Sequence, residues 1–270
     1  MTTPAIKLNQ GIHVMHLFYR LNRQRWAQLP SGESLRILQS LTQLCGQYAN
    51  PSHPRLCTYA NVCGKADLVF MLYAAELQLL AQMHRDLENL FPPGCLETVY
   101  SYLSVTELSE YMPTEEDNKN ILAAEKLEPG SEAWSKRAAE LAARMKEYEH
   151  YRLYPELPDW EIMAFYAMNK RRQGGDNWYS LDFATRKKMM GGHARVGRKY
   201  SGRITQLITG STGLDDWEWG VTLVAHQVDA IKEIVYEMRF DEVTARFGEF
   251  GPFYINMRLQ PGEVWRHLHL

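Results

Sequence analysis

The chain has 270 residues, of which 45% are hydrophobic and 23% are charged, and its formal net charge at pH 7 is −2. This length and composition argue against disorder and fit one large domain or two domains of ordinary size. The longest apolar run, residues 68–75, is far short of a membrane span, and the start at Met1 lacks the basic and then apolar layout of a signal peptide. We therefore expect a cytoplasmic protein without a membrane span.

The four cysteines all fall in the first half of the chain. They form no CxxC pair and have no companion His at the spacing of a zinc finger, so we expect reduced thiols. They are Cys45, Cys57, Cys63 and Cys95.

Charge is distributed unevenly along the chain. Residues 166–203 contain ten Lys or Arg against Asp176 and Asp182, so this segment carries +8 and the rest of the chain carries −10. A solvated helix face is the simplest explanation, and charge alone slightly favours it. A nucleic acid is a second candidate partner, although the segment has no glycine-aromatic RNA-binding motif and no recognisable helix-turn-helix. A small ligand with several carboxylates is the third.

The first half of the chain predicts the order strand, helix, strand, strand, helix, strand. Aromatic and β-branched residues indicate a strand at 11–21, and leucines at helical spacing indicate a helix from Glu33 to about Tyr48. The remaining elements are strands at 56–63, 67–73 and 96–105 and a helix at 75–90, which the prolines at 92 and 93 stop.

The same order recurs in the second half. Its predicted elements are strands at 161–170, 204–209, 217–225 and 251–257 and helices at 182–200 and 228–238. We therefore predict an α+β fold in which two ferredoxin-like halves form a dimeric α+β barrel. The predicted boundaries are 1–112 for a structural N-terminal half, 113–158 for a connecting segment with a solvent-facing helix at 131–148, and 159–270 for the C-terminal half.

His193 lies inside the helix predicted at 182–200, directly after Gly191 and Gly192. Each glycine costs a helix interior roughly 1 kcal/mol relative to alanine, so these two indicate a purpose other than helix stability. They would let a flat ligand lie against the backbone beside the imidazole. A lone His is more often structural than a ligand, but no second His, Cys or carboxylate stands at ligand spacing for zinc or non-haem iron, whereas haem needs one protein ligand. The pattern favours an iron porphyrin bound through His193.

Three chemically different side chains share one face of the strand predicted at 161–170. Tyr166, Met168 and Lys170 alternate along it, so they point the same way. An edge strand with Lys170 in solvent and Met168 filling a gap would explain them without a ligand. As the wall of a pocket, Met168 would touch a ring, Tyr166 could be oxidised, and Lys170 could hold a carboxylate.

Two residues outside this strand complete the candidate site. Arg152, after the connecting helix, could hold a second carboxylate in bidentate fashion, although a surface arginine is the more ordinary role. Gln206 follows His193 by thirteen residues, on the next strand. Glutamine can donate a hydrogen bond to a ligand on iron but cannot act as a general base, so a haem site facing it would be a weak ordinary peroxidase.

At these residues the sequence resembles the coproheme decarboxylases, which are peroxide-dependent haem synthases of the chlorite dismutase superfamily. The resemblance runs from about Tyr151 to Tyr254, with a weaker match at SVTELSEY (104–111). Its motifs are YAMNKR (166–171), DNWY (176–179), HARVGRKY (193–200), TGSTGLDDWEWG (209–220) and YEMRFDE (236–242).

The resemblance implies a role for each candidate residue. His193 stands where the family has its proximal iron ligand, and Tyr166 stands where it has the radical-forming tyrosine. Lys170 and Arg152 stand at propionate-binding positions, and Gln206 occupies the distal position. Chlorite-degrading relatives carry a distal arginine there, so the glutamine argues against chlorite dismutation.

The resemblance also implies four further residues in contact with the substrate. The backbone of Ala167, Met168 and Asn169 would line it, with Ala167 standing where proline is common. Thr244 falls where many members have a propionate-binding serine, and it keeps the hydroxyl while adding a methyl group.

The implied activity is oxidation of the porphyrin's own side chains. With hydrogen peroxide, two propionates of iron coproporphyrin III would become vinyl groups, giving haem b, so that iron coproporphyrin III (coproheme) is both substrate and redox centre. The resemblance further implies a homopentamer.

Two other functions stay open on sequence alone. A haem carrier or sensor would keep His193 but would not need Tyr166 and Lys170 on one face. A nucleic-acid-binding α+β protein would use the basic segment, and its binding would be strongly salt-dependent.

Overall fold

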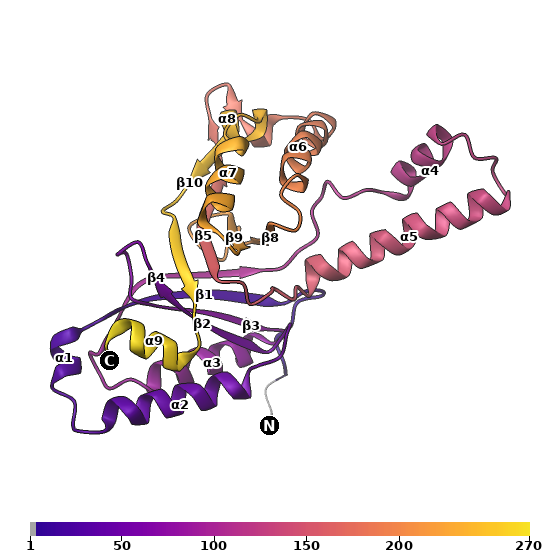
Figure 1. Ribbon diagram of the computed structural model, residues 1–270. Coiled ribbons are helices and arrows are strands. Elements are labelled where there is room, and N and C mark those ends of the chain that lie inside the picture. Colours follow the sequence, from indigo (N-terminus) through magenta and orange to yellow (C-terminus); the bar gives the residue numbers. More distant parts are fainter. Residues whose placement is uncertain (1–3) are drawn as a thin grey trace.

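The structure is a computed structural model that describes residues 4–270 (Figure 1). The first half contains the four strands and two helices that the sequence predicts, with a short extra helix after the first strand. Their bounds are β1 (His13–Leu21), α1 (Arg23–Ala27), α2 (Glu33–Gln47), β2 (Arg55–Asn61), β3 (Leu68–Ala74), α3 (Leu77–Asn89) and β4 (Leu96–Val105). In α2 the buried residues Ile37, Leu41 and Leu44 are spaced by four and three, so they form one apolar face.

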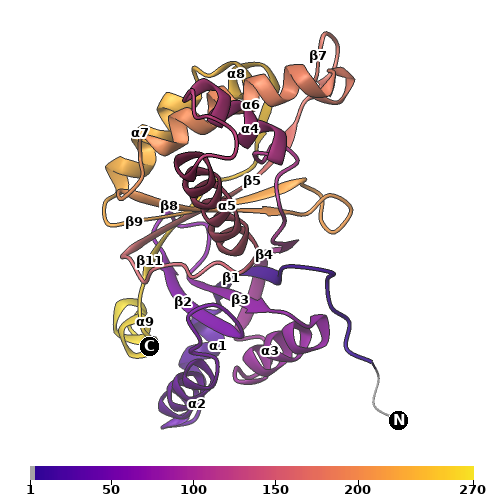
Figure 2. The ribbon, with the colours of Figure 1, turned by 90° about the vertical axis from the view of Figure 1, so that its right-hand side faces the viewer.

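Between the halves, α4 (Glu115–Ala124) and α5 (Glu132–Leu153) form an arm that projects from the body of the molecule (Figures 1 and 2). The Ser131 side chain accepts a hydrogen bond from the Trp134 N–H and begins α5 where the sequence predicts a helix. The helix continues to Leu153, beyond the predicted end at 148, and most of its residues are exposed as predicted. The sequence prediction contains no helix at α4.

The second half contains every predicted helix and strand together with shorter elements that were not predicted. Its bounds are β5 (Ile162–Lys170), β6 (Arg172–Gln173), β7 (Asp176–Asn177), the 3-10 helix η1 (Trp178–Ser180), α6 (Phe183–Arg198), β8 (Ile204–Gly210), β9 (Trp219–Ala225), α7 (Val228–Met238), α8 (Glu242–Phe247), β10 (Gly248–Phe250), β11 (Tyr254–Arg258) and α9 (Pro261–Leu268).

The strand predicted at 251–257 is wrong in its bounds. The region forms two strands that pair with successive parts of β5: β10 with its end from Met168 to Lys170 and β11 with its first half. The break falls at Gly251 and Pro252, and proline has no N–H to donate to a sheet.

Eight of the strands close into a ring. Their order is β5-β11-β2-β3-β1-β4-β8-β9, and β9 pairs back to β5. Within it, the N-terminal half contributes β4-β1-β3-β2 and the C-terminal half contributes β11-β5-β9-β8. These two runs have equivalent antiparallel orders, which confirms the predicted pair of ferredoxin-like halves.

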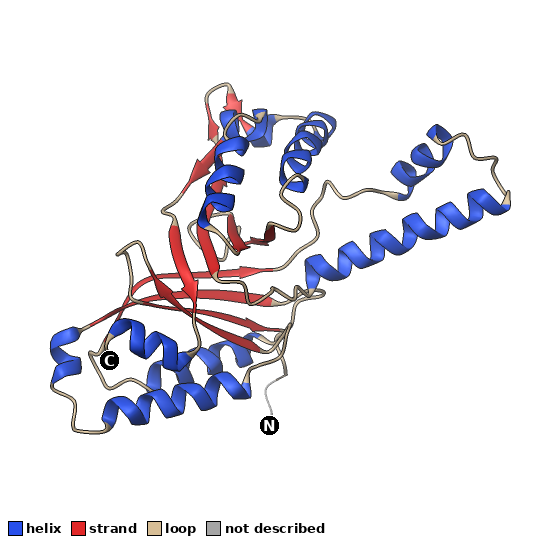
Figure 3. Ribbon diagram, in the orientation of Figure 1, coloured by secondary structure: helices blue, strands red, loops and turns tan. Residues whose placement is uncertain are grey.

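Side chains alternate between the inside and the outside of this ring. Val14, Phe18 and Phe165 belong to the interior core between the halves. On the outer surface of the N-terminal half, α2, α3 and α9 pack against Leu17 and Phe70, and helices lie on both sides of the strands (Figure 3). Among residues 4–270 no helix has the length and apolar content needed to cross a bilayer.

Candidate functional site

The outer face of β5 carries the predicted alternating side chains. Phe165 and Ala167 point into the barrel core, whereas Tyr166 is buried in a separate core outside the ring, against which Met168 packs. The predicted division of this strand into two chemically different faces is confirmed.

The Tyr166 ring lies in an aromatic stack. Its centroid is 4.4 Å from that of Phe253 in stacked geometry and 5.7 Å from that of Phe250. The Arg239 guanidinium lies over Phe250, 3.9 Å from the ring centroid. Burial raises the pKa of Tyr166 and the nearby Arg239 charge lowers it by less. The phenol is therefore protonated at neutral pH.

Gln206 lies on the same outer surface as Tyr166, two strands away. Val221 of β9 pairs with Tyr166 on one side and with Ile208 on the other, and Gln206 is two positions along β8 from Ile208. Because adjacent strands lie about 4.8 Å apart, roughly 10 Å separates the backbones of β5 and β8. The two residues flank one strip of the sheet.

His193 is held by a carboxylate from another helix. Its Nδ1 lies 2.9 Å from Asp241 Oδ2. Asp241 caps α8, because its Oδ1 accepts the Thr244 N–H at 3.1 Å and its Oδ2 accepts the Thr244 hydroxyl at 2.9 Å. With Nδ1 donating to a carboxylate, Nε2 keeps its lone pair for a metal, and the carboxylate raises its basicity.

The charge on Asp241 is stabilised by these contacts. Burial opposes ionisation of the carboxyl group, but the His193 and Thr244 hydrogen bonds outweigh it, so the pKa of Asp241 falls below its usual value. The Asp241 carboxylate is therefore ionised at neutral pH.

Lys170 lies among charges on the His193 side of the strand. Its ammonium group is 5.0 Å from the centroid of the Trp178 ring. Burial lowers the pKa of Lys170 to about 8, and the charges of Asp241 and Glu218 oppose that shift. The positive charge of Lys170 thus lies near the negative charge of Asp241, a neighbour that the sequence prediction did not include.

Helix α6 faces the sheet without being packed down on it. None of its sixteen residues is buried, whereas α7 buries Ala230, Ile231 and Ile234. His193 and Gly197 are four residues apart and share one face. A Cβ atom on Gly197 would lie 3.3 Å from the Gln206 side chain, so this face of α6 is directed toward β8.

The two glycines before His193 are not required by protein packing. A Cβ atom on Gly191 would meet no other atom within 4 Å, and one on Gly192 would meet only Arg195, at 3.9 Å. A reason other than close packing of the chain is needed for both of them.

Arg152 lies at the edge of the same strip. Its Nη2 donates to the carbonyl oxygens of Ile208 at 3.3 Å and Glu107 at 3.4 Å. Its Nε is buried and has no partner among the described residues. A buried donor without an acceptor is costly, so this geometry suits an acceptor supplied by a ligand.

The backbone of the predicted substrate-lining residues is engaged within the sheet. Ala167 and Met168 pair with β9, and Met168 and Asn169 pair with β10. The Asn169 side chain accepts the Glu218 N–H at 2.8 Å. Any contact of these residues with a ligand therefore comes from the flat face of the strand.

Most of the basic charge at 166–203 is balanced within the chain. Six of its ten cations form ion pairs: Arg171 with Asp176 and Glu249, Arg172 with Glu218, Arg186 with Glu110, Lys187 with Asp117, Lys199 with Glu237, and Arg203 with Glu233. The charge asymmetry alone therefore does not require an anionic partner, because all of these carboxylates except Asp176 come from other segments of the chain.

Two residues of the site are missing from the sequence prediction. Asp241 and Arg239 both fall in the YEMRFDE motif at 236–242. An Asp followed three residues later by Thr244 is a helix-capping signal, but its contact with His193 spans 48 residues of sequence and is not visible in that pattern.

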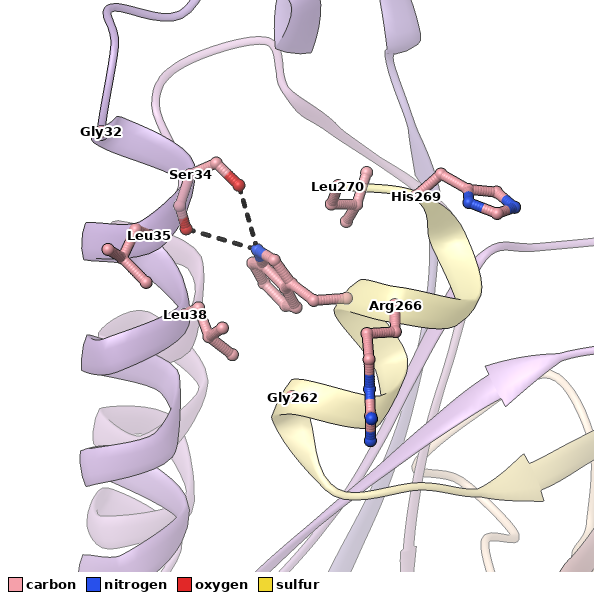
Figure 4. Close-up of a pocket in the computed structure, with 9 residues that line it drawn as sticks. Gly32, Ser34, Leu35, Leu38, Gly262, Arg266, His269 and Leu270 are labelled. Carbon is pink, nitrogen blue, oxygen red and sulfur yellow. Dashed lines mark hydrogen bonds between the residues drawn. The ribbon is translucent and has the colours of Figure 1, made fainter.

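A surface hollow of about 580 Å³ lies elsewhere, between α2 and α9 (Figure 4). Leu35 and Leu38 line it from α2, and Trp265 of α9 donates its indole N–H to the Ser34 carbonyl at 3.3 Å. None of the predicted site residues lines this hollow, so it is separate from the candidate site.

Comparisons with known proteins agree on one family. The sequence profile of the family described as chlorite dismutase matches residues 35–259. A heme-binding protein from Thermus thermophilus is 35% identical, covers 99% of this chain and 98% of its own, and has a TM-score of 0.79. A chlorite dismutase mutant from Candidatus Nitrospira defluvii is 15% identical, with coverage of 97% and 98% and a TM-score of 0.71. The chlorite dismutase of that organism in complex with imidazole is also 15% identical, covers 97% of each chain and has a TM-score of 0.70.

Proposed function

This chain belongs to the chlorite dismutase family, and from that premise we propose that it binds iron coproporphyrin III through His193 and uses hydrogen peroxide to convert two of its propionates to vinyl groups. The product is haem b. The observation that carries the proposal is the His193–Asp241 pair, which leaves Nε2 available for iron on the helix that faces the Tyr166 side of the sheet. The relative named as heme-binding supports a ligand of this class.

The residues present fit an iron porphyrin. His193 supplies one nitrogen ligand, and the space over Gly191 and Gly192 is open. The unpartnered Nε of Arg152 suits a ring carboxylate, and so does the ammonium of Lys170. The Thr244 hydroxyl already donates its one proton to Asp241, so it would bind a propionate only by giving up that bond. The flat face of the strand at Ala167, Met168 and Asn169 would lie against the ring.

Tyr166 is the residue that we assign to the chemistry. When bound, the iron porphyrin supplies the oxidising power of peroxide. Tyr166 gives up an electron and a proton together, which suits a phenol that burial keeps protonated, and then takes a hydrogen atom from the propionate β-carbon. Loss of CO2 and of one more electron leaves the vinyl group, so each turn consumes one peroxide and one proton and forms two waters. Arg152 and Lys170 orient the propionates, and this positioning supplies the selectivity.

The test is mass spectrometry of the porphyrin after addition of peroxide. The wild-type protein should remove two CO2 units, and Tyr166→Phe should bind the porphyrin but remove none. Tyr254→Phe is the matched control, because Tyr254 is buried on the opposite, inner side of the sheet. Normal turnover by Tyr166→Phe would rule out the tyrosyl step, and intact porphyrin with wild-type protein would rule out the enzyme.

A haem carrier or sensor is the second candidate, favoured by the relative that is named only as heme-binding. It requires His193 but neither Tyr166 nor peroxide, so unchanged porphyrin after peroxide would select it. Gln206 in place of an arginine disfavours chlorite as a substrate, and no oxygen release from chlorite is expected. We also propose a homopentamer, which sedimentation analysis of the purified protein would test.

A further inference from the structure

Glu107 is an exposed residue whose carboxyl group packs against the sheet, and the proposed chemistry does not use it. The residue follows β4, and its side chain packs directly on Gly210 of β8. A Cβ atom at Gly210 would lie 2.4 Å from the Glu107 carboxyl carbon, so only glycine leaves room for this placement. Close packing against Gly210 therefore holds the carboxyl group in a defined position, beside the strip of sheet between Tyr166 and Gln206.

One cation and one neutral donor face this carboxyl group. Arg152 lies beside it and donates to the Glu107 backbone carbonyl at 3.4 Å, and the Trp219 indole of β9 is the neutral donor near the carboxyl group. Burial raises the pKa of Glu107, and these two neighbours lower it by less. Tyr151, a further titratable group at this end of α5, donates its hydroxyl to the Gln206 carbonyl at 3.2 Å.

Glu107 does not satisfy the hydrogen-bonding capacity of the Arg152 guanidinium group. The hydrogen bonds of its guanidinium group go to backbone carbonyl oxygens, and the buried Nε has no acceptor within the described chain. A ligand carboxylate that filled this place would lie near the Glu107 carboxyl group. Two neighbouring carboxylates repel each other, and where burial already raises the pKa of one of them, as it does for Glu107, that group is the one that takes up a proton.

We propose that Glu107 is a further ligand-binding residue, which takes up a proton when a porphyrin propionate binds Arg152 and then donates a hydrogen bond to that propionate. The inference rests on the proposed function, since it requires a ligand with carboxylates at this strip. No redox step is involved, because the proton comes from solvent and stays on Glu107 while the ligand is bound.

The experiment measures proton uptake when metal-free coproporphyrin III binds the purified protein. Calorimetric titrations at pH 7 in two buffers with different ionisation enthalpies give the number of protons taken up. The wild type should take up about one proton, so its affinity should fall by close to tenfold per unit of rising pH. Glu107→Gln keeps the shape and an N–H donor, and it should bind with almost no uptake and little pH dependence.

Two control variants separate this effect from a change in folding. Glu110→Gln removes the next carboxylate along the chain, which pairs with Arg186 at 3.4 Å, and it should take up the same proton as the wild type. Arg152→Gln should weaken binding and remove the uptake together. Binding by the wild type with no proton uptake, or equal uptake by Glu107→Gln, would overturn the role of Glu107 alone. No binding by the wild type would overturn the proposed function as well.

Discussion

Replacing Asp241 by Asn tests whether the carboxylate prepares His193 for iron. Asparagine can still cap α8 by accepting the Thr244 N–H, because Asn and Asp are similar caps. Its amide cannot match the charge-assisted bond that now joins Oδ2 to His193 Nδ1 at 2.9 Å. Loss of a carboxylate that orients a metal-ligating His weakens metal affinity by roughly 10- to 100-fold, which corresponds to about 1.4 to 2.7 kcal/mol.

The assay is an absorbance titration of the protein with ferric coproporphyrin III, followed by denaturant unfolding of the ligand-free protein. Asp182→Asn is the matched control, since Asp182 caps α6 through Thr185 with the same two bonds, at 2.9 and 2.7 Å, but does not contact His193. We expect weaker porphyrin binding only in Asp241→Asn and similar small losses of stability in both variants. Equal porphyrin affinity in the two variants would refute the assignment of Asp241.

Two further predictions concern buried charges. The pKa of Lys170 is about 8 in the folded protein, below the 10.5 of an unfolded chain. Burial of its charged form therefore lowers the free energy of unfolding most below pH 8, and this loss shrinks as the pH rises toward 10.5. In the folded protein its positive charge is lost around pH 8, so the fall of porphyrin affinity with rising pH should steepen there in the wild type but keep one slope in Lys170→Arg; parallel pH profiles would contradict this. Asp159→Ala should lower the free energy of unfolding by about 2 to 4 kcal/mol, because one carboxylate oxygen binds both Arg55 at 3.0 Å and Arg258 at 2.8 Å, and the two guanidinium groups are almost buried. Glu233→Ala, which breaks an exposed pair with Arg203, should cost less than about 1 kcal/mol in the same denaturant titration, and equal losses would count against the buried cluster.

The elements that follow from sequence are those with a strong period or a clear cap. The leucines at helical spacing within 33–48 and the helix start near Asp182 are local patterns, and the structure has α2 and α6 where they indicate. The predicted apolar face of α2 is only partly right, because Leu35 is exposed and Ile37 is buried. The short helix α8 has too few turns to show a period. Helix α9 is absent from the prediction although its sequence carries the signals: buried residues at helical spacing (Pro261, Val264, Trp265 and Leu268) and a capping box of Gln260 with Glu263.

The sequence predicted which residues lie at the site better than it predicted the groups that surround them. Alternation along β5 was enough to place Tyr166 and Lys170 on one face. The charges that surround Lys170 come from Asp241 and Glu218, which join the strand only in three dimensions. Local patterns therefore predict which way a side chain points, whereas its partners depend on the closed ring of strands.

The two halves of the barrel use the same plan with one difference in their first helices. In α2, Ile37, Leu41 and Leu44 seal that helix onto its sheet. The corresponding first helix of the other half is α6, which has no buried apolar side chain on its sheet-facing side and carries His193. A duplicated architecture thus places equivalent helices over the two halves, one sealed by aliphatic side chains and the other not. If the proposed porphyrin binds beneath α6, a small change in one helix is enough to give the two halves different roles.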